Sequence, residues 1–143
     1  MSTTLLGNNQ PIFSRLGDVQ WANGVTAGNT ATNIVVGTSY LAFTSDGTAG
    51  GYVQRIRFRP LGNNIATVAR VWINNGSAPT GATANNILFD EVSLAASNAS
   101  TSSALSNTEL PLNFALPANY RLYVTLGTGV TAGYDVSVIG GKY

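Results

Sequence analysis

Two residue types are missing from this chain: its 143 residues include no histidine and no cysteine. Histidine is the commonest general base and metal ligand, and cysteine is the most nucleophilic of the ordinary side chains. Disulfides and zinc sites made of thiolates or imidazoles are excluded with them. Any acid–base chemistry would depend on six carboxylates, seven cations and neutral hydroxyls. We therefore predict a structural or binding protein and no enzyme, with no catalytic residue, no metal and no cofactor.

Charge is also scarce. Charged residues make up 9% of the chain and apolar residues 44%, whereas about 25% of the residues in an ordinary soluble domain are charged. The formal charge of +1 gives no basic field for DNA or RNA, so we expect no nucleic-acid partner. A nearly neutral surface opposes self-association only weakly. This favours a homo-oligomer, with a polar monomer as the alternative.

Long hydrophobic runs are absent as well. No apolar stretch approaches the roughly 20 residues that a transmembrane helix needs. The first residues do not combine a basic segment with a following apolar stretch, so they predict no signal peptide. We expect no membrane partner.

What the chain does contain is small and polar: Ala, Gly, Ser, Thr and Asn supply more than half of it. These residues favour turns, and the runs between the turn signals are rich in Val, Ile, Tyr, Phe and Thr, without a helical period. We predict strands at residues 10–15, 33–36, 40–44, 52–59, 66–74, 87–94, 112–116, 120–126 and 134–139. The pattern predicts an all-β fold, a single-domain antiparallel β-sandwich of jelly-roll-like type. A closed barrel is the alternative.

The first thirty residues differ in texture, because their large apolar residues follow no period. We interpret residues 1–30 as an extended amino-terminal arm and residues 31–143 as the β-sandwich domain; an ordinary first strand packed on the sandwich is the alternative. Exposed apolar side chains on an arm would need cover from the domain or from a neighbour. The candidate partner-binding residues of this segment are Leu5, Leu6, Ile12, Phe13 and Trp21.

The clearest alternation lies in residues 52–59. It places Arg55, Arg57 and Arg59 on one face together with Val53, and the even-numbered residues on the other. Neighbouring guanidinium groups would then stand about 6.6 Å apart. Such a row can bind acidic groups, but one exposed ion pair contributes only about 0–1 kcal/mol, so an effective contact would need repetition in an oligomer. The alternative is a solvated sheet face.

Other candidate sites are weaker. Asp90 and Glu91 are adjacent, so on a strand they would point to opposite faces and would not form a hydrolytic carboxylate pair. The loop at Asp46 lacks the alternating acidic ligands of a calcium site. The Trp and Tyr residues could include a platform on which sugars stack, although sandwich cores also need aromatic rings.

Several segments resemble small β-rich virion proteins of tailed bacteriophages. The first carries the alternating arginines that end at Pro60, and the last is the closing Gly140-Gly141-Lys142-Tyr143; the full set is residues 51–64, 66–76, 109–112, 116–124 and 140–143. The resemblance covers residues 30–143 and does not extend to the first thirty.

The resemblance implies a capsid decoration, or cement, protein: a jelly-roll-like subunit, commonly trimeric, that sits on the outer shell and stabilises the junctions between capsomers. Its partners would be further copies of itself and the major capsid protein. It would be made in the host cytoplasm and would end on the surface of the virion. The family supplies no catalytic residues. The alternative function is a tail or fibre adhesin module that binds a host surface glycan through exposed aromatic residues.

Overall fold

The computed structural model describes residues 14–143, which form two antiparallel four-stranded sheets. The elements in chain order are β1 (Leu16–Val25), β2 (Tyr40–Thr44), β3 (Gly51–Pro60), β4 (Thr67–Asn74), the 3-10 turn η2 (Thr83–Asn85), β5 (Asn86–Leu94), β6 (Thr108–Leu116), β7 (Arg121–Leu126) and β8 (Tyr134–Lys142). The described residues contain no α-helix. The predicted β-sandwich is therefore confirmed.

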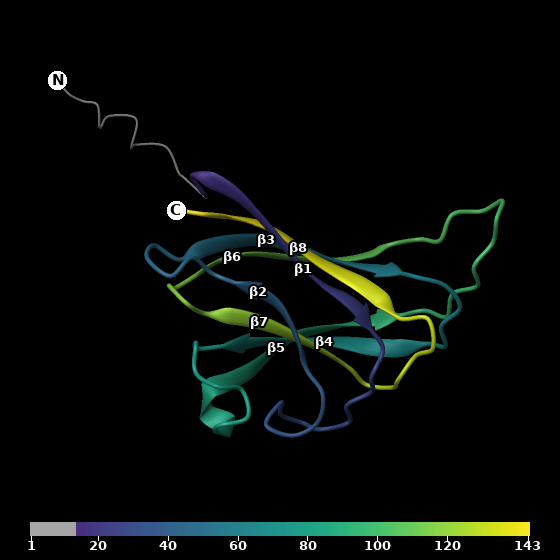
Figure 1. Cartoon of the computed structure of the whole chain (residues 1–143), viewed down its shortest axis with the longest axis horizontal. Helices are drawn as coiled ribbons and strands as arrows, with labels where there is room; N and C mark the ends of the chain where they lie inside the picture. The colour runs from purple at the N-terminus through teal and green to yellow at the C-terminus, as the bar shows by residue number, and fades with distance from the viewer. Residues whose placement is uncertain (1–13) are drawn as a thin grey trace.

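Each sheet draws on both halves of the chain. The first sheet has the order β1-β8-β3-β6 and the second has the order β2-β7-β4-β5. β1 thus pairs with β8, β2 with β7, β3 with β6 and β4 with β5, always antiparallel. This is the pairing of one long antiparallel hairpin, strands 1 to 4 against strands 8 to 5, that is folded into two sheets. Figure 1 shows the sheets as two layers, with the β1–β2 connection running along the outside of the second sheet.

The core lies between the two layers. It consists of the inward side chains of both sheets, and the largest of them are fully buried: Phe43, Phe58, Ile56, Leu122, Leu126 and Tyr134. Because side chains alternate along a strand, burying one row of each sheet leaves the other row outside. The outer rows are therefore the surfaces that this fold can offer to a partner.

The sequence located seven of the eight strands and missed β1. Leu16–Val25 carry a mixture of Asp, Gln, Asn and Gly among their apolar residues, so their period is hidden, yet they pair with β8 along the edge of the first sheet. Ten of the thirty residues interpreted as an arm thus form a strand of the sandwich, as the alternative interpretation had it. The strand predicted at residues 10–15 falls mostly on residues 1–13, which lie outside the described residues; Ser14 and Arg15 are described and do not belong to a strand.

The strand predicted at residues 33–36 is wrong. These residues form turns in the connection between β1 and β2. Ile34 is nevertheless buried, because the connection folds over the outer face of the second sheet and forms a small second cluster with Trp72 and Tyr123. The apolar run was a signal of burial and not of a strand.

The outer-face position predicted for Val53 of β3 was also wrong. The register of β3 against both neighbours shifts between Val53 and Arg55, which marks a β-bulge at Gln54. The extra residue turns Val53 into the core with Ile56. The arginines after the bulge keep the shared outer face that the alternation predicted.

The four edge strands differ in how they are closed. On β1, the Gln20 amide accepts a hydrogen bond from the Thr44 N–H and donates one to the Thr44 carbonyl, both at 2.8 Å, which ties β1 to β2 across the two sheets. β6 is an edge strand and contains Pro111 and a left-handed Asn113. Proline and irregular backbone both discourage pairing with another strand. β5 has neither.

Candidate interaction surfaces

The outer face of the first sheet carries the arginine row. Arg55, Arg57 and Arg59 lie on β3 opposite Ile139, Ser137 and Asp135 of β8. β3 is an inner strand of this sheet, so the row runs along the middle of the face. The outer face is formed because Ile56 and Phe58, the residues between the arginines, are fully buried in the core.

The same face brings Trp21 into line with this row. Trp21 of β1 pairs with Ser137 of β8, and Ser137 pairs with Arg57 of β3. Two strand spacings, about 10 Å, therefore separate the backbones of Trp21 and Arg57. The Trp21 side chain is 62% exposed, and its neighbour on the same face, Val19, is 52% exposed. An apolar flank and a basic centre thus share one surface, a juxtaposition that the sequence did not predict.

The charges on this face are unevenly balanced. The Nε of Arg57 donates to Glu109 Oε2 of β6 at 2.7 Å. Arg55 Nε lies 3.4 Å from the same oxygen, within ion-pair distance but without a hydrogen bond. Arg59 donates instead to the Leu105 carbonyl and to Asn107 Oδ1. One carboxylate therefore serves two guanidinium groups, and Arg59 has no carboxylate partner among residues 14–143.

A second group of exposed apolar residues, the β5 patch, lies along the edge strand β5; Leu88 pairs with Trp72 and Ile87 with Ile73, so their side chains project on the two sides of this strand edge. Ile87, Leu88 and Phe89 are consecutive and 58%, 46% and 42% exposed. A register shift of β5 against β4 falls at Phe89, and the ring of Phe89 reaches across to Phe114 of β6, with centroids 4.8 Å apart. This contact joins the two sheets along their common side. Three adjacent large apolar residues on an open strand edge are unusual in a monomer, because such an edge can template further pairing.

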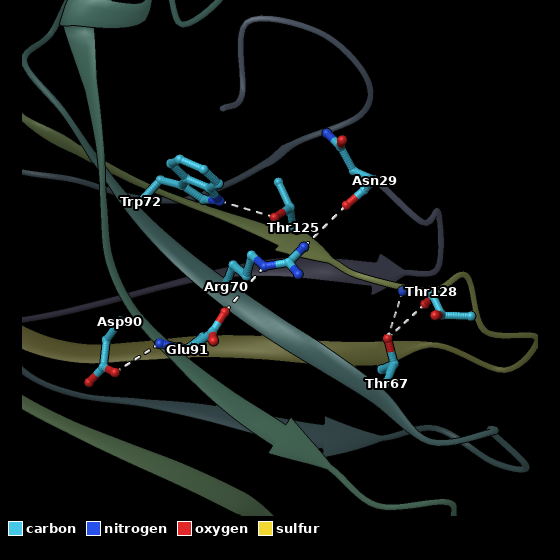
Figure 2. A network of polar contacts seen from close by, with 8 residues as sticks. All are labelled: Asn29, Thr67, Arg70, Trp72, Asp90, Glu91, Thr125 and Thr128. Carbon is cyan, nitrogen blue, oxygen red and sulfur yellow. Dashed lines mark hydrogen bonds and ion pairs between the residues drawn. The ribbon is translucent and has the colours of Figure 1, made fainter. Parts of the chain in front are cut away.

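Polar contacts fix the outer face of the second sheet beside that patch (Figure 2). Arg70 of β4 lies between two partners, donating to Glu91 Oε2 of β5 at 3.2 Å and to the Asn29 carbonyl at 3.4 Å. The indole N–H of Trp72 donates to the Thr125 hydroxyl at 3.0 Å. Arg70 thus links β4 to its neighbour β5 and to the β1–β2 connection, which covers part of this outer face.

Asp90 is the exception in that view. Its carboxylate accepts only a local bond from the Glu91 N–H, at 2.8 Å, and points away from Arg70 (Figure 2). Within the described part of the chain no cation lies at ion-pair distance from it. In the register with β4, Glu91 lies opposite Arg70 and Asp90 lies opposite Val71. The β5 patch therefore combines apolar side chains with an uncompensated negative charge.

Three described side chains have perturbed pKa values. Although burial opposes the shift, hydrogen bonds from the Ala27 and Thr26 N–H groups lower the pKa of Tyr40. Burial raises the pKa of Tyr134 at the start of β8. The Ala49 and Thr48 N–H groups lower the pKa of Asp46 in the β2–β3 loop. Between residues 14 and 143 no group of three or more acidic side chains is placed to hold a metal ion. Each shift follows from burial or from backbone hydrogen bonds.

The Tyr134 hydroxyl is buried and has no hydrogen-bond partner among the residues that the structure describes. Its side chain borders a cavity of about 320 Å³ under the β5–β6 connection, lined by Pro60, Leu94, Leu105 and small residues of that connection. The hydroxyl oxygen is not accessible from the cavity in this conformation, since less than 1 Å² of it is exposed. It is therefore a buried hydroxyl whose hydrogen-bonding capacity the described core does not use.

The predicted partner-binding residues separate into two groups. Trp21, Arg55, Arg57 and Arg59 share one face of the first sheet, while Leu5, Leu6, Ile12 and Phe13 lie outside the described residues. Sequence reasoning missed the β5 patch. Its signal was present as the unbroken run Ile87-Leu88-Phe89 in an otherwise alternating strand, but a run of this kind equally fits a buried strand.

No helix in residues 14–143 is long and apolar enough to cross a bilayer. No protein-family model, no curated protein and no solved structure matches the chain.

Proposed function

We propose that the chain is a structural virion protein of a tailed bacteriophage, a capsid decoration protein that binds the outer shell, stabilises capsomer junctions and assembles with further copies of itself, as a trimer. The observation that carries the proposal is the outer face of the first sheet, where exposed Trp21 and Val19 stand beside the arginine row. A rigid sheet that presents apolar and basic groups is suited to permanent docking. It offers no reactive group of its own.

The fold supports the same proposal. We infer that the sandwich is a jelly roll, because its eight strands pair 1–8, 2–7, 3–6 and 4–5 in two sheets. The second supporting feature is the low charge. A particle surface assembled from many copies accumulates the repulsion of every subunit, so a chain with a formal charge of +1 can pack densely on a lattice.

The test is co-sedimentation with purified expanded heads of the phage or prophage that encodes the chain. We expect saturable binding with a stoichiometry set by the capsomer lattice, and heads that resist heating better once decorated. An unrelated β-sandwich of similar size is the control for trapping in the pellet. Heads that neither bind the chain nor gain heat resistance would refute the decoration role.

The contribution of the first residues can be tested separately. Because β1 begins at Leu16, removal of residues 1–13 leaves every described strand intact. We expect this deletion to weaken binding to heads while the melting temperature stays near that of the full chain. Unchanged binding would exclude residues 1–13 from the contact with the shell.

The exposed indole of Trp21 also favours the second function, an adhesin module of a tail or fibre that stacks its aromatic residue on a host glycan. Sugar stacking needs a solvent-facing aromatic ring on a fixed backbone, which β1 provides. A glycan array separates the two functions: specific glycan hits that disappear in Trp21→Ala, together with no binding to heads, would support the adhesin.

A further inference from the structure

We propose that copies of this chain associate head-to-tail, with the β5 patch of one copy (Ile87, Leu88, Phe89 and Asp90) seated on the outer face of the first sheet of the next copy. This inference rests on the self-assembly part of the proposed function and is independent of binding to the shell.

The first argument is that both surfaces need cover. Trp21 and Val19 expose more than half of their side-chain surface on one, and Ile87 does so on the other. Apolar groups gathered in this way are typical of protein–protein contacts. They lie on different sheets and different sides of the sandwich, since β1 is an edge of the first sheet and β5 is the far edge of the second. One copy can therefore use both at the same time.

The second argument is charge. On the face of the first sheet, Arg55 and Arg57 share the carboxylate of Glu109, and Arg59 has no carboxylate within ion-pair distance in residues 14–143. On the β5 patch, Glu91 is paired with Arg70, whereas Asp90 accepts only a local backbone bond. The excess is basic on one surface and acidic on the other. Each surface therefore complements the other and repels a second copy of itself.

This complementarity selects the type of contact. An isologous dimer would place two β5 patches together and bring two unpaired Asp90 carboxylates close to each other. A heterologous contact pairs Asp90 with the arginine row and covers both apolar patches in one interface. Repeated contacts of this kind close into a ring or continue as a filament. A closed ring is what a trimer requires.

The experiment uses the full chain in solution, without heads. Trp21→Asp disables the face, Leu88→Asp disables the patch, and Ile65→Asp is a matched control, because Ile65 is 59% exposed on the loop between β3 and β4. All three sites are exposed, so each variant should keep the native circular dichroism spectrum and melting profile. Native mass spectrometry and sedimentation equilibrium then give the masses over a range of concentrations.

We expect the wild type and Ile65→Asp to form the same oligomer. Trp21→Asp and Leu88→Asp should each weaken association by about tenfold or more, because each removes a central apolar anchor. An equimolar mixture of these two variants retains one intact contact, between the patch of Trp21→Asp and the face of Leu88→Asp. The mixture should therefore give a dimer of 1:1 composition and no larger ring.

A different result overturns the inference. If Leu88→Asp is monomeric, Trp21→Asp still associates and the mixture gives no mixed dimer, the contact is an isologous dimer through β5. If both variants associate as the wild type does, neither surface is the contact. A wild type that stays monomeric at millimolar concentration also refutes it. A chain that assembles in this way but does not bind heads contradicts only the decoration role, and a chain that binds heads as a monomer contradicts only the head-to-tail contact.

Discussion

Asn64 offers the sharpest test of how the loops of this sandwich are held. It is 5% exposed and lies between β3 and β4. Its Oδ1 accepts hydrogen bonds from the Ala132 N–H at 3.0 Å and the Gly133 N–H at 2.8 Å, and its Nδ2 donates to the Gly133 carbonyl at 3.0 Å. Its backbone also pairs with Ser97. One side chain thus satisfies the turn that leads into β8 while its backbone holds the β5–β6 connection.

Asn64→Ala removes the three side-chain bonds and keeps the backbone pair. A hydrogen bond in a folded protein contributes about 1 kcal/mol, and a buried donor that is left without a partner adds a penalty of similar size. We expect the free energy of unfolding to fall by about 3 kcal/mol. For a chain of 143 residues, an unfolding entropy of about 2.1 cal/mol/K per residue converts this loss into a decrease of roughly 10 °C in melting temperature.

The assay is urea and thermal unfolding followed by circular dichroism, at one fixed protein concentration because association adds apparent stability. Asn63→Ala is the matched control: it removes one exposed hydrogen bond, from the Ala99 N–H to Asn63 Oδ1. This control should change the stability by less than about 1 kcal/mol. Equal losses in the two variants would refute the assignment of Asn64 as the polar centre of these loops.

Three further predictions concern single positions. Tyr134→Phe removes a buried hydroxyl without a described partner and should raise the free energy of unfolding by about 1 kcal/mol. Burial raises the pKa of Tyr134, so above pH 10.0 the unfolded chain releases this proton first. The wild type should therefore lose stability as the pH rises above 10.0, and the variant should lack this loss. A less stable variant in urea unfolding would mean that the hydroxyl has a partner. Gly50→Ala should lower the free energy of unfolding by more than about 1 kcal/mol. Gly50 has a φ of +79°, and an added Cβ would collide with the carbonyl oxygen of Leu116 at the end of β6. An unchanged urea midpoint would contradict this. The Ala49 and Thr48 N–H groups lower the pKa of the Asp46 carboxyl, so the stability that this carboxylate contributes is lost as the pH falls below 3.8. The free energy of unfolding of Asp46→Asn should therefore fall less than that of the wild type in this pH range. Parallel acid unfolding curves of the two proteins would refute this.

The alternation of apolar residues predicted most of the strands because it reports directly on which side chains face the core. β4 shows this well: it carries apolar residues on both faces, and it lies between β7 and β5 with Trp72 covered by the β1–β2 connection. β1 was not predicted because an edge strand needs only one row of side chains packed against the rest of the sandwich. Its Asp18 and Gln20 are tolerated inside the edge through hydrogen bonds to each other and to Thr44.

Only part of the candidate site could be predicted from the sequence. The arginine row could be predicted, since alternation along one strand needs no knowledge of its neighbours. The partnership of Trp21 with that row could not, because 34 to 38 residues separate them in the chain and the register of β1, β8 and β3 joins them. The facing of Val53 failed for a related reason: a bulge is set by the partner strands and leaves no mark in the alternation.

The sequence by itself determined the class of this protein. Its turn signals, its alternating apolar runs and its lack of a helical period specify an all-β chain. The tertiary structure decided which residues share those surfaces, because strand pairing brings distant segments into register and buries one row of each sheet. It alone leaves Trp21 beside the arginines and Asp90 without a cation from residues 14–143, and the proposed contact between copies follows from these two placements.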